Sequence, residues 1–132
     1  MTAPLPNVPV PLLVVDGANV VGSVPDGWWK DRPAAAIRLR NRLARVTSPG
    51  LPDLPGPLEV ALVVEGKAKD IEQTDDGVRV VRAPGSGDDM IVELVAREGP
   101  GRHVVVVTAD RELRDRVTAL GAEIRGPSSI PR

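Results

Sequence analysis

Five short segments of the chain are rich in aliphatic residues and have the length of β-strands. Three of them, 12–15, 60–64 and 104–107, are apolar at every position, which indicates strands buried on both faces, as in a parallel α/β sheet. The other two, 78–81 and 122–125, are interrupted by charged side chains and are expected at the sheet edges. Right-handed crossovers then favour the strand order 3-2-1-4-5, numbered along the chain.

Three longer segments between these strands carry apolar residues at helical spacing. They run from about Pro33 to about Thr47, from about 88 to 98 and from about 110 to 120. The residues expected to face the core are Ala35, Leu39, Leu43, Val46, Ile91, Leu94, Val95, Leu113, Val117 and Leu120. Strands that alternate with helices in this way predict an α/β fold with a mostly parallel, five-stranded central sheet.

The remaining segments are punctuated by proline and glycine. Residues 1–11 are expected to be an extended lead-in, residues 48–57 an irregular connection and residues 126–132 a tail. Residues 1–132 are therefore expected to form one domain, with a core from about 12 to 125. No apolar run approaches the roughly 20 residues of a membrane span, and we expect a cytoplasmic protein.

Composition argues against several kinds of active site. Cysteine is absent and His103 is the single histidine, which argues against a thiol nucleophile, a zinc site and a Ser-His-Asp triad. The net charge of −1 provides no global attraction to nucleic acid, so such binding would require local clusters of arginine.

Acidic residues stand where the predicted strands end or where the next helix begins. Asp16 ends the first strand, Asp110 follows the fourth, and Asp88 opens the second long helix. In open α/β sheets, ligands bind beyond the carboxyl ends of the strands, where the strand order reverses. In the order 3-2-1-4-5 this point lies between the first and fourth strands. Asp16 and Asp110 are therefore expected to share a crevice, with Asp88 at its rim.

Three carboxylates in one crevice repel one another unless a cation joins them. Oxygen ligands without histidine or cysteine favour magnesium or manganese over zinc, and such a metal supports phosphodiester hydrolysis. Each acid also has a structural interpretation. Asp16 fits an Asx-type turn, Asp110 a helix N-cap, and Asp89 a capping box with Ser86.

Other polar residues are candidates for supporting roles. Asn19 is placed to orient Asp16 or a bound water, and Thr108 to do the same for Asp110. Glu65 follows the second strand and is a candidate further acid, although an ordinary loop acid is an equally good interpretation.

Three short motifs lie at the predicted strand ends in a fixed order. They are Asp16-Gly-Ala-Asn19-Val, Gly85-Ser-Gly-Asp88-Asp89-Met-Ile91 and Thr108-Ala-Asp110-Arg-Glu-Leu113. Together, over about residues 12–125, they resemble the motifs of the NYN domain, a PIN-like ribonuclease fold.

This resemblance implies a three-layer PIN-like fold and a metal-dependent endoribonuclease that uses Mg²⁺ or Mn²⁺. Carried over onto the motifs, it makes Asp16, Asp88 and Asp110 the metal ligands and Asn19 a positioning group. Asp89 and Glu65 are further candidate ligands. The resemblance leaves open whether one metal or two are bound.

Arginine and tryptophan residues outline a candidate RNA-binding surface. Three arginines form a stripe at i, i+4 and i+7 on the first long helix, away from its core face. The candidates for phosphate contacts and base stacking are Arg38, Arg42, Arg45, Arg111, Arg114, Trp28 and Trp29. A solvated stripe, and a tryptophan pair that anchors a loop or makes a dimer contact, are the structural alternatives.

Two functions of other classes stay open. A nucleotide phosphohydrolase would use the same acids, but the Glu-Glu-x-x-Asp helix pattern and the Asp-x-Asp loop of such enzymes are absent. A non-catalytic RNA-binding module would not need the acids. Single-stranded RNA is the expected partner, no membrane is expected, and a homodimer or protein partner is left open.

Overall fold

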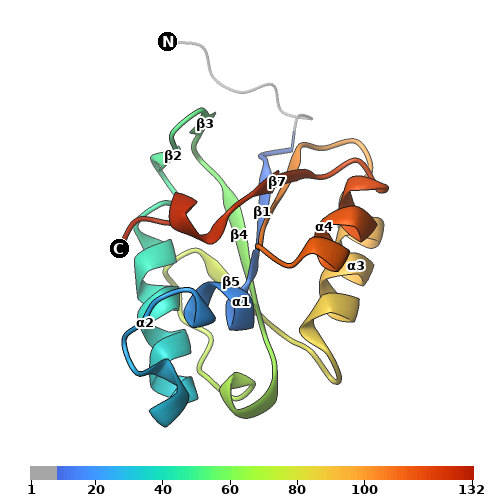
Figure 1. Cartoon of the computed structure of the whole chain (residues 1–132). Coiled ribbons are helices and arrows are strands. Elements are labelled where there is room, and N and C mark those ends of the chain that lie inside the picture. Colours follow the sequence, from blue (N-terminus) through green and yellow to red (C-terminus); the bar gives the residue numbers. More distant parts are fainter. Residues whose placement is uncertain (1–8) are drawn as a thin grey trace.

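A five-stranded parallel sheet forms the middle layer of the protein, seen nearly edge-on in Figure 1. The structure is a computed structural model and describes residues 9–132. The strands of the sheet are β1 (Leu12–Asp16), β4 (Glu59–Val64), β5 (Val78–Arg82), β6 (Val104–Val107) and β7 (Glu123–Arg125). Their order is β5-β4-β1-β6-β7, and every pairing is parallel. The predicted order 3-2-1-4-5 is confirmed.

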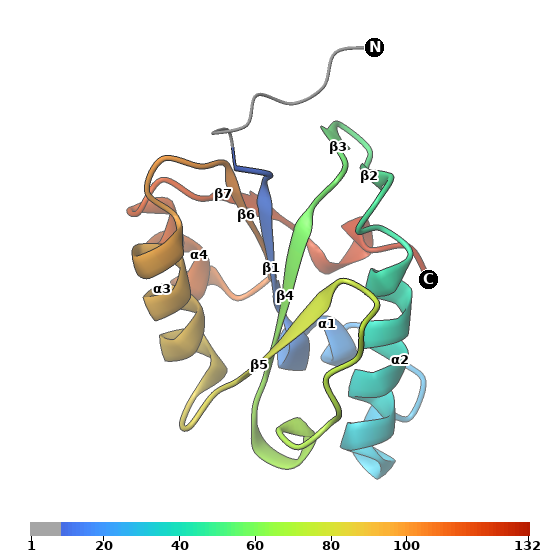
Figure 2. The same ribbon diagram turned by 180° about the vertical axis from the view of Figure 1, so that it is seen from behind.

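Helices cover both faces of this sheet, as the two opposite views show (Figure 1, Figure 2). They are α1 (Gly17–Gly22), α2 (Arg32–Ala44), α3 (Gly87–Glu98) and α4 (Arg111–Thr118). The alternating side chains of β1 separate two cores: Leu13 and Val15 face α1 and α2, whereas Leu12 and Val14 face α3 and α4. Because both faces are covered, the strand must be apolar at consecutive positions.

Helix α1 was not predicted, because its six residues are too few to show an apolar period. It begins directly after β1, where the Asp16 side chain accepts a hydrogen bond from the backbone N–H of Asn19 at 3.4 Å and caps the helix. Helix α2 begins one residue before the predicted Pro33, since Asp31 caps it by accepting from Ala34 N–H at 3.0 Å.

Two connecting segments are more ordered than predicted. The connection at 48–57 contains a small hairpin of β2 (Gly50–Leu51) and β3 (Leu54–Pro55), and its two leucines are buried. Residues 126–132, expected as a tail, contain a 3₁₀ turn, and Ile130 is only 3% exposed against the α2 core.

The expectation that Leu120 packs in the core is wrong. Its side chain is 47% exposed, because α4 ends at Thr118 and the chain then turns away. Of the lead-in predicted for residues 1–11, the first eight residues lie outside the described part of the chain. Within residues 9–132, no helix has the length and apolar character needed to cross a membrane.

Candidate active site

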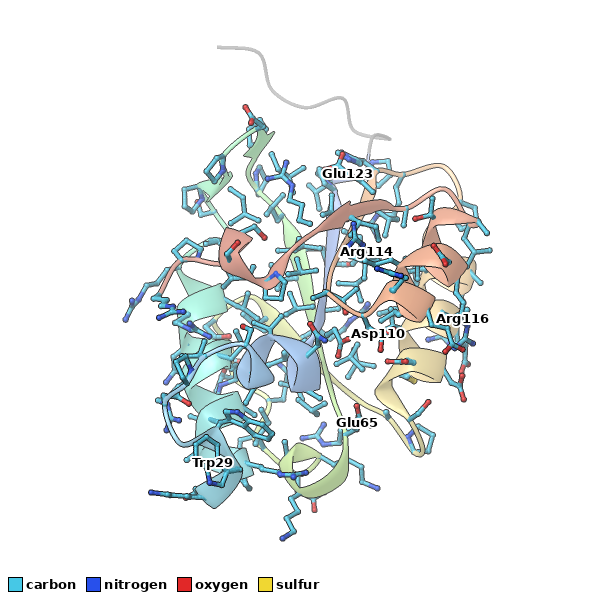
Figure 3. The ribbon with its side chains drawn as sticks, in the orientation of Figure 1. Trp29, Glu65, Asp110, Arg114, Arg116 and Glu123 are labelled. Atoms are coloured by element: carbon cyan, nitrogen blue, oxygen red, sulfur yellow. The ribbon has the colours of Figure 1, made fainter. Side chains whose placement is uncertain are left out.

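The carboxyl edge of the sheet brings four acidic residues close to one another, and we call this group of acids the crevice. Asp16 ends β1, Glu65 follows β4, Asp110 follows β6, and Asp88 lies in the first turn of α3. In Figure 3, Glu65 and Asp110 lie near the end of β1, between α1 and α3. The crevice is located where the strand order reverses, between β1 and β6, as the sequence predicted for Asp16 and Asp110.

Asp16 is only 4% exposed, and two hydrogen bonds hold its carboxyl group. Thr108 Oγ1 donates to Asp16 Oδ2 at 2.8 Å, and the backbone N–H of Asn19 donates to Oδ1 at 3.4 Å. Burial is the main cause that raises the pKa of Asp16 from 3.8 to about 6; the hydrogen bonds lower it. The negative charges of Asp88 and Glu65 add to the increase. The fold therefore favours the neutral carboxyl of Asp16 more than water does.

Side-chain hydrogen bonds tie the end of β1 to the turn between β6 and α4. Asn19 Oδ1 accepts from the backbone N–H of Ala109 at 2.8 Å. The Thr108 hydroxyl, besides donating to Asp16, accepts from the backbone N–H of Asp110 at 3.1 Å. Asn19 and Thr108 thus determine how the two acidic strand ends lie relative to each other. Thr108 was expected to orient Asp110. Its hydroxyl contacts the backbone of Asp110 and also the side chain of Asp16.

Asp88 and Asp110 begin helices on the same side of the sheet. Burial raises the pKa of Asp88 above its usual range, and the charges of Asp110 and Glu65 raise it further. Asp110 Oδ1 accepts from Leu113 N–H at 2.9 Å, so Asp110 is also the N-cap of α4. The capping role and a place in the crevice are therefore compatible.

The two additional candidate acids occupy different environments. Glu65 Oε1 lies 2.8 Å from the point that a Cβ on Gly87 would occupy, so the missing side chain at position 87 lets Glu65 approach α3. Asp89 has a 76% exposed side chain and pairs with Arg116 at 3.1 Å, while its N–H donates to Ser86 Oγ at 3.2 Å. Glu65 belongs to the crevice, and Asp89 faces the surface beside α4.

The chemistry of the crevice fits a hard divalent cation. Carboxylates that raise one another's pKa are stabilised by a positive charge among them, and oxygen ligands suit magnesium and manganese. Among residues 9–132, no group of three acidic or histidine side chains is already arranged to hold a metal ion. Mg²⁺ keeps several waters and takes only one or two carboxylates directly, so it does not require a closed protein cage.

The arginine stripe of α2 is divided between two environments. Arg38, which pairs with Asp26 at 3.3 Å, lines the same shallow hollow as Arg42, whereas Arg45 is exposed. Arg42 is half-buried beside Arg132 in a shallow hollow, and burial is the main cause that lowers its pKa. The even spacing in the sequence thus does not produce three equivalent phosphate contacts.

The other candidates for RNA contact lie in the turn before α2 and in α4. Trp28 and Trp29 form a 3₁₀ turn, Trp28–Lys30, before α2, and Trp29 is 58% exposed at the outer end of that helix (Figure 3). Arg111 and Arg114 are exposed in α4, directly after Asp110. Arg111 and Arg114 are therefore available to solvent on the helix that Asp110 caps.

No known protein family and no curated protein matches this sequence. Rae1 (YacP) from Bacillus subtilis superimposes with a TM-score of 0.70 at 22% identity, covering 89% of this chain and 70% of Rae1. The W164L mutant of Rae1 superimposes with a TM-score of 0.65 at 18% identity and the same coverage of both chains. The K83A mutant of T5 5′-exonuclease superimposes with a TM-score of 0.52 at 15% identity, and the match covers 93% of this chain and 52% of the exonuclease. The protein has an NYN/PIN-like fold.

In this PIN-like fold, Gly17 is required because α1 packs closely against β4. A Cβ at position 17 would lie 2.5 Å from the carbonyl oxygen of Val63 and 3.2 Å from the Leu62 side chain. Gly17→Ala is expected to lower the free energy of unfolding by about 1–3 kcal/mol, because the backbone of β4 cannot move aside freely.

Gly22→Ala, in the last turn of the same helix, is the matched control. There the nearest atom to a Cβ lies at the ordinary distance of 3.8 Å, on the Trp28 ring, and alanine favours helix over glycine. We therefore expect no loss of stability for Gly22→Ala in urea denaturation. Equal midpoints for the two variants would contradict the close approach of α1 to β4.

Proposed function

We propose that this protein is a metal-dependent endoribonuclease that cleaves single-stranded RNA at the crevice of Asp16, Asp88 and Asp110. The observation that carries the proposal is the group of partly buried acids at the reversal of strand order, with the pKa values of Asp16 and Asp88 raised. PIN-like nucleases generally use divalent metal ions, and one structural neighbour is named a 5′-exonuclease. The preference for RNA rests on the resemblance of the three motifs to the NYN domain.

Each residue has a role in this proposal. Asp16, Asp88 and Asp110 would hold Mg²⁺ or Mn²⁺, and the bound ion would polarise a phosphate oxygen and activate a water for hydrolysis. Thr108 and Asn19 hold the acids and the α4 turn in place through the hydrogen bonds described above. Together these residues would hold the negatively charged groups in fixed positions around a bound cation.

The test is an assay on mixed single-stranded RNA in Mg²⁺ or Mn²⁺. We expect cleavage that excess chelator abolishes and added Mn²⁺ restores, because the carboxylates alone repel the phosphate. Single-stranded DNA, duplex RNA and nucleoside triphosphates serve as parallel substrates. Cleavage that persists in chelator would exclude the metal mechanism.

The same assay separates the two alternative functions. Phosphate release from nucleotides without RNA cleavage would indicate a phosphohydrolase, and RNA binding without cleavage would indicate a non-catalytic module.

Phosphate binding by the α2 stripe has its own test. Replacing Arg38, Arg42 and Arg45 by alanine is expected to weaken RNA binding and to reduce its salt dependence, by about 0.7 in the log-log slope per lost contact. Binding is measured at several salt concentrations. Arg97→Ala, on α3 at the opposite face of the sheet, is the control. If the slope of RNA affinity against salt concentration is unchanged, the three arginines do not contact phosphate and are only a solvated helix face.

A further inference from the structure

A pocket opens beside the acid crevice, on the face of the sheet covered by α1 and α2. Its volume is about 310 Å³, at the lower end of the range for small-molecule sites. Aliphatic side chains form most of the wall, including Val21, Ala36, Val64 and Ala68. Such a pocket suits a flat, largely apolar group the size of one ring system.

Trp28 supplies an aromatic wall that is already held in place. The Arg32 guanidinium lies over the Trp28 ring, 5.4 Å from its centroid, and the Trp29 ring contacts it edge-on at 6.0 Å and 89°. Trp28 and Arg32 line the pocket, whereas Trp29 does not. The two neighbours thus restrict the ring before any ligand arrives, which reduces the entropy lost on stacking.

The pocket and the acid crevice share a wall. Glu65 lines the pocket, and its charge also raises the pKa values of Asp16 and Asp88. Gly17, the residue after Asp16, lines the pocket as well. Glu65 can accept a hydrogen bond from the N–H groups of a base, and because Arg32 and Glu65 both line the pocket, it has no net positive charge to hold a phosphate. The cation proposed for the crevice would attract the phosphate there, which leaves the pocket for the base.

We propose that this pocket binds one unpaired nucleobase of the RNA, adjacent to the scissile phosphate, by stacking it on Trp28. The inference rests on the proposed function and deepens it, because a base inside a duplex cannot enter the pocket without unpairing. The pocket thereby selects single-stranded RNA at one defined position relative to the cut. Trp29, which was grouped with Trp28 by sequence, has a secondary role as the edge-on support of the Trp28 ring.

The experiment uses a short single-stranded oligoribonucleotide whose cleavage position has been mapped in Mn²⁺. The same oligonucleotide is then made with one abasic residue at each position around the cut, and kcat/KM is measured for each. For the wild type, one abasic position is expected to lower kcat/KM by about 5- to 150-fold, the effect of losing one stacked base. Trp28→Ala should lose a similar factor on the intact oligonucleotide, and Trp28→Phe much less.

The decisive comparison is the abasic oligonucleotide with Trp28→Ala. If the base and the Trp28 ring contact each other, removing both lowers kcat/KM by little more than removing either one. The abasic residue should therefore have little further effect on kcat/KM of Trp28→Ala. Trp29→Ala should lose less than Trp28→Ala, and Leu120→Ala, an exposed apolar residue on the far side of the sheet, should match wild type. Thermal melts confirm that each variant is folded.

Two results would overturn the inference. The first is that the wild type cleaves the intact oligonucleotide normally and that no abasic position lowers its kcat/KM. The second is that the abasic residue lowers kcat/KM of Trp28→Ala by the same factor as it lowers kcat/KM of the wild type. The wild-type abasic series decides the matter even if Trp28→Ala does not fold. If the protein cleaves no RNA at all, the proposed function is wrong and this inference is wrong with it. If the protein cleaves RNA but shows either of the two results above, only this inference is wrong.

Discussion

Asp16→Asn is expected to abolish RNA cleavage and yet to leave the metal-free protein at least as stable as the wild type near neutral pH. Asp16 is 4% exposed, and burial is the main cause that raises its pKa to about 6, so its ionised form is strained in the fold. Asparagine removes this charge and keeps one acceptor oxygen, which can accept from the Thr108 hydroxyl, and only the longer bond from Asn19 N–H at 3.4 Å is given up. Loss of activity with gain of stability is the usual sign of a functional residue.

The pH dependence of stability follows from the direction of this shift. The folded pKa of Asp16, about 6, lies above the unfolded value near 3.8. The neutral carboxyl therefore stabilises the fold fully below about pH 4, and this contribution is lost as the pH rises through about 6. The difference between a pKa of 3.8 and one of about 6, at about 1.4 kcal/mol per pH unit, gives a loss of at most about 3 kcal/mol.

Urea denaturation of the metal-free proteins at about pH 4 and about pH 8 tests this expectation. The advantage of Asp16→Asn over wild type should be near zero at the lower pH and largest at the higher. Asp115→Asn, an exposed acid on α4, should show no such difference. If Asp16→Asn is much less stable than wild type at about pH 8, Asp16 is a structural turn residue.

Metal ions provide a second measurement on the same two proteins. At roughly 100 times its dissociation constant, Mg²⁺ or Mn²⁺ should stabilise the wild type by about 2.7 kcal/mol. Asp16→Asn should gain much less, because a ligand is missing. Equal gains would place the cation elsewhere on the protein.

Thr108→Val is expected to lower metal affinity and kcat/KM by about 10- to 100-fold, although Thr108 is not placed as a metal ligand. Its hydroxyl is fully buried, donates to Asp16 Oδ2 at 2.8 Å and accepts from the N–H of Asp110 at 3.1 Å. Valine keeps the shape but breaks both bonds. Two buried groups lose their partner, so the stability should also fall by about 1–3 kcal/mol.

The pH profile distinguishes this positioning role from simple loss of packing. The Thr108 hydrogen bond lowers the pKa of Asp16, so its removal lets protons compete with the metal up to a higher pH. The loss of metal affinity should therefore be larger at about pH 6 than at about pH 8. Thr108→Ser should recover most of the activity, and Thr118→Val, on the exposed end of α4, should have no effect. A Ser variant as impaired as Val would contradict the role of the hydroxyl.

The sequence alone determined the sheet and the edge on which the acids lie. Strands such as Leu12–Val15 are apolar at every position because helices must cover both faces, and this pattern is visible without any tertiary information. The handedness of crossovers then leaves few strand orders, and the one predicted is the one observed. Asp16 and Asp110 share a crevice for the same reason, since the carboxyl ends of parallel strands lie at one edge.

Only the tertiary structure decided which polar groups contact one another. Asp88 and Asp89 are adjacent in sequence, yet Asp89 pairs with Arg116, 27 positions later, and Asp88 faces the crevice acids. The contact between Asn19 and Ala109 joins segments 90 positions apart. The rotation of a helix about its axis and the packing of distant segments set these contacts, and neither is encoded in local spacing.

Local spacing in the sequence also could not predict the pocket beside the crevice. Sequence reasoning treated Trp28 and Trp29 as one pair, because adjacent aromatic residues in a proline-rich loop look equivalent. The fold places the Trp28 ring in a pocket that Val64, at the end of β4, and the following Glu65 also line, and it leaves the Trp29 side chain 58% exposed. Hydrophobic periodicity thus determined the scaffold, whereas the placement of single side chains depended on close packing between segments far apart in the chain.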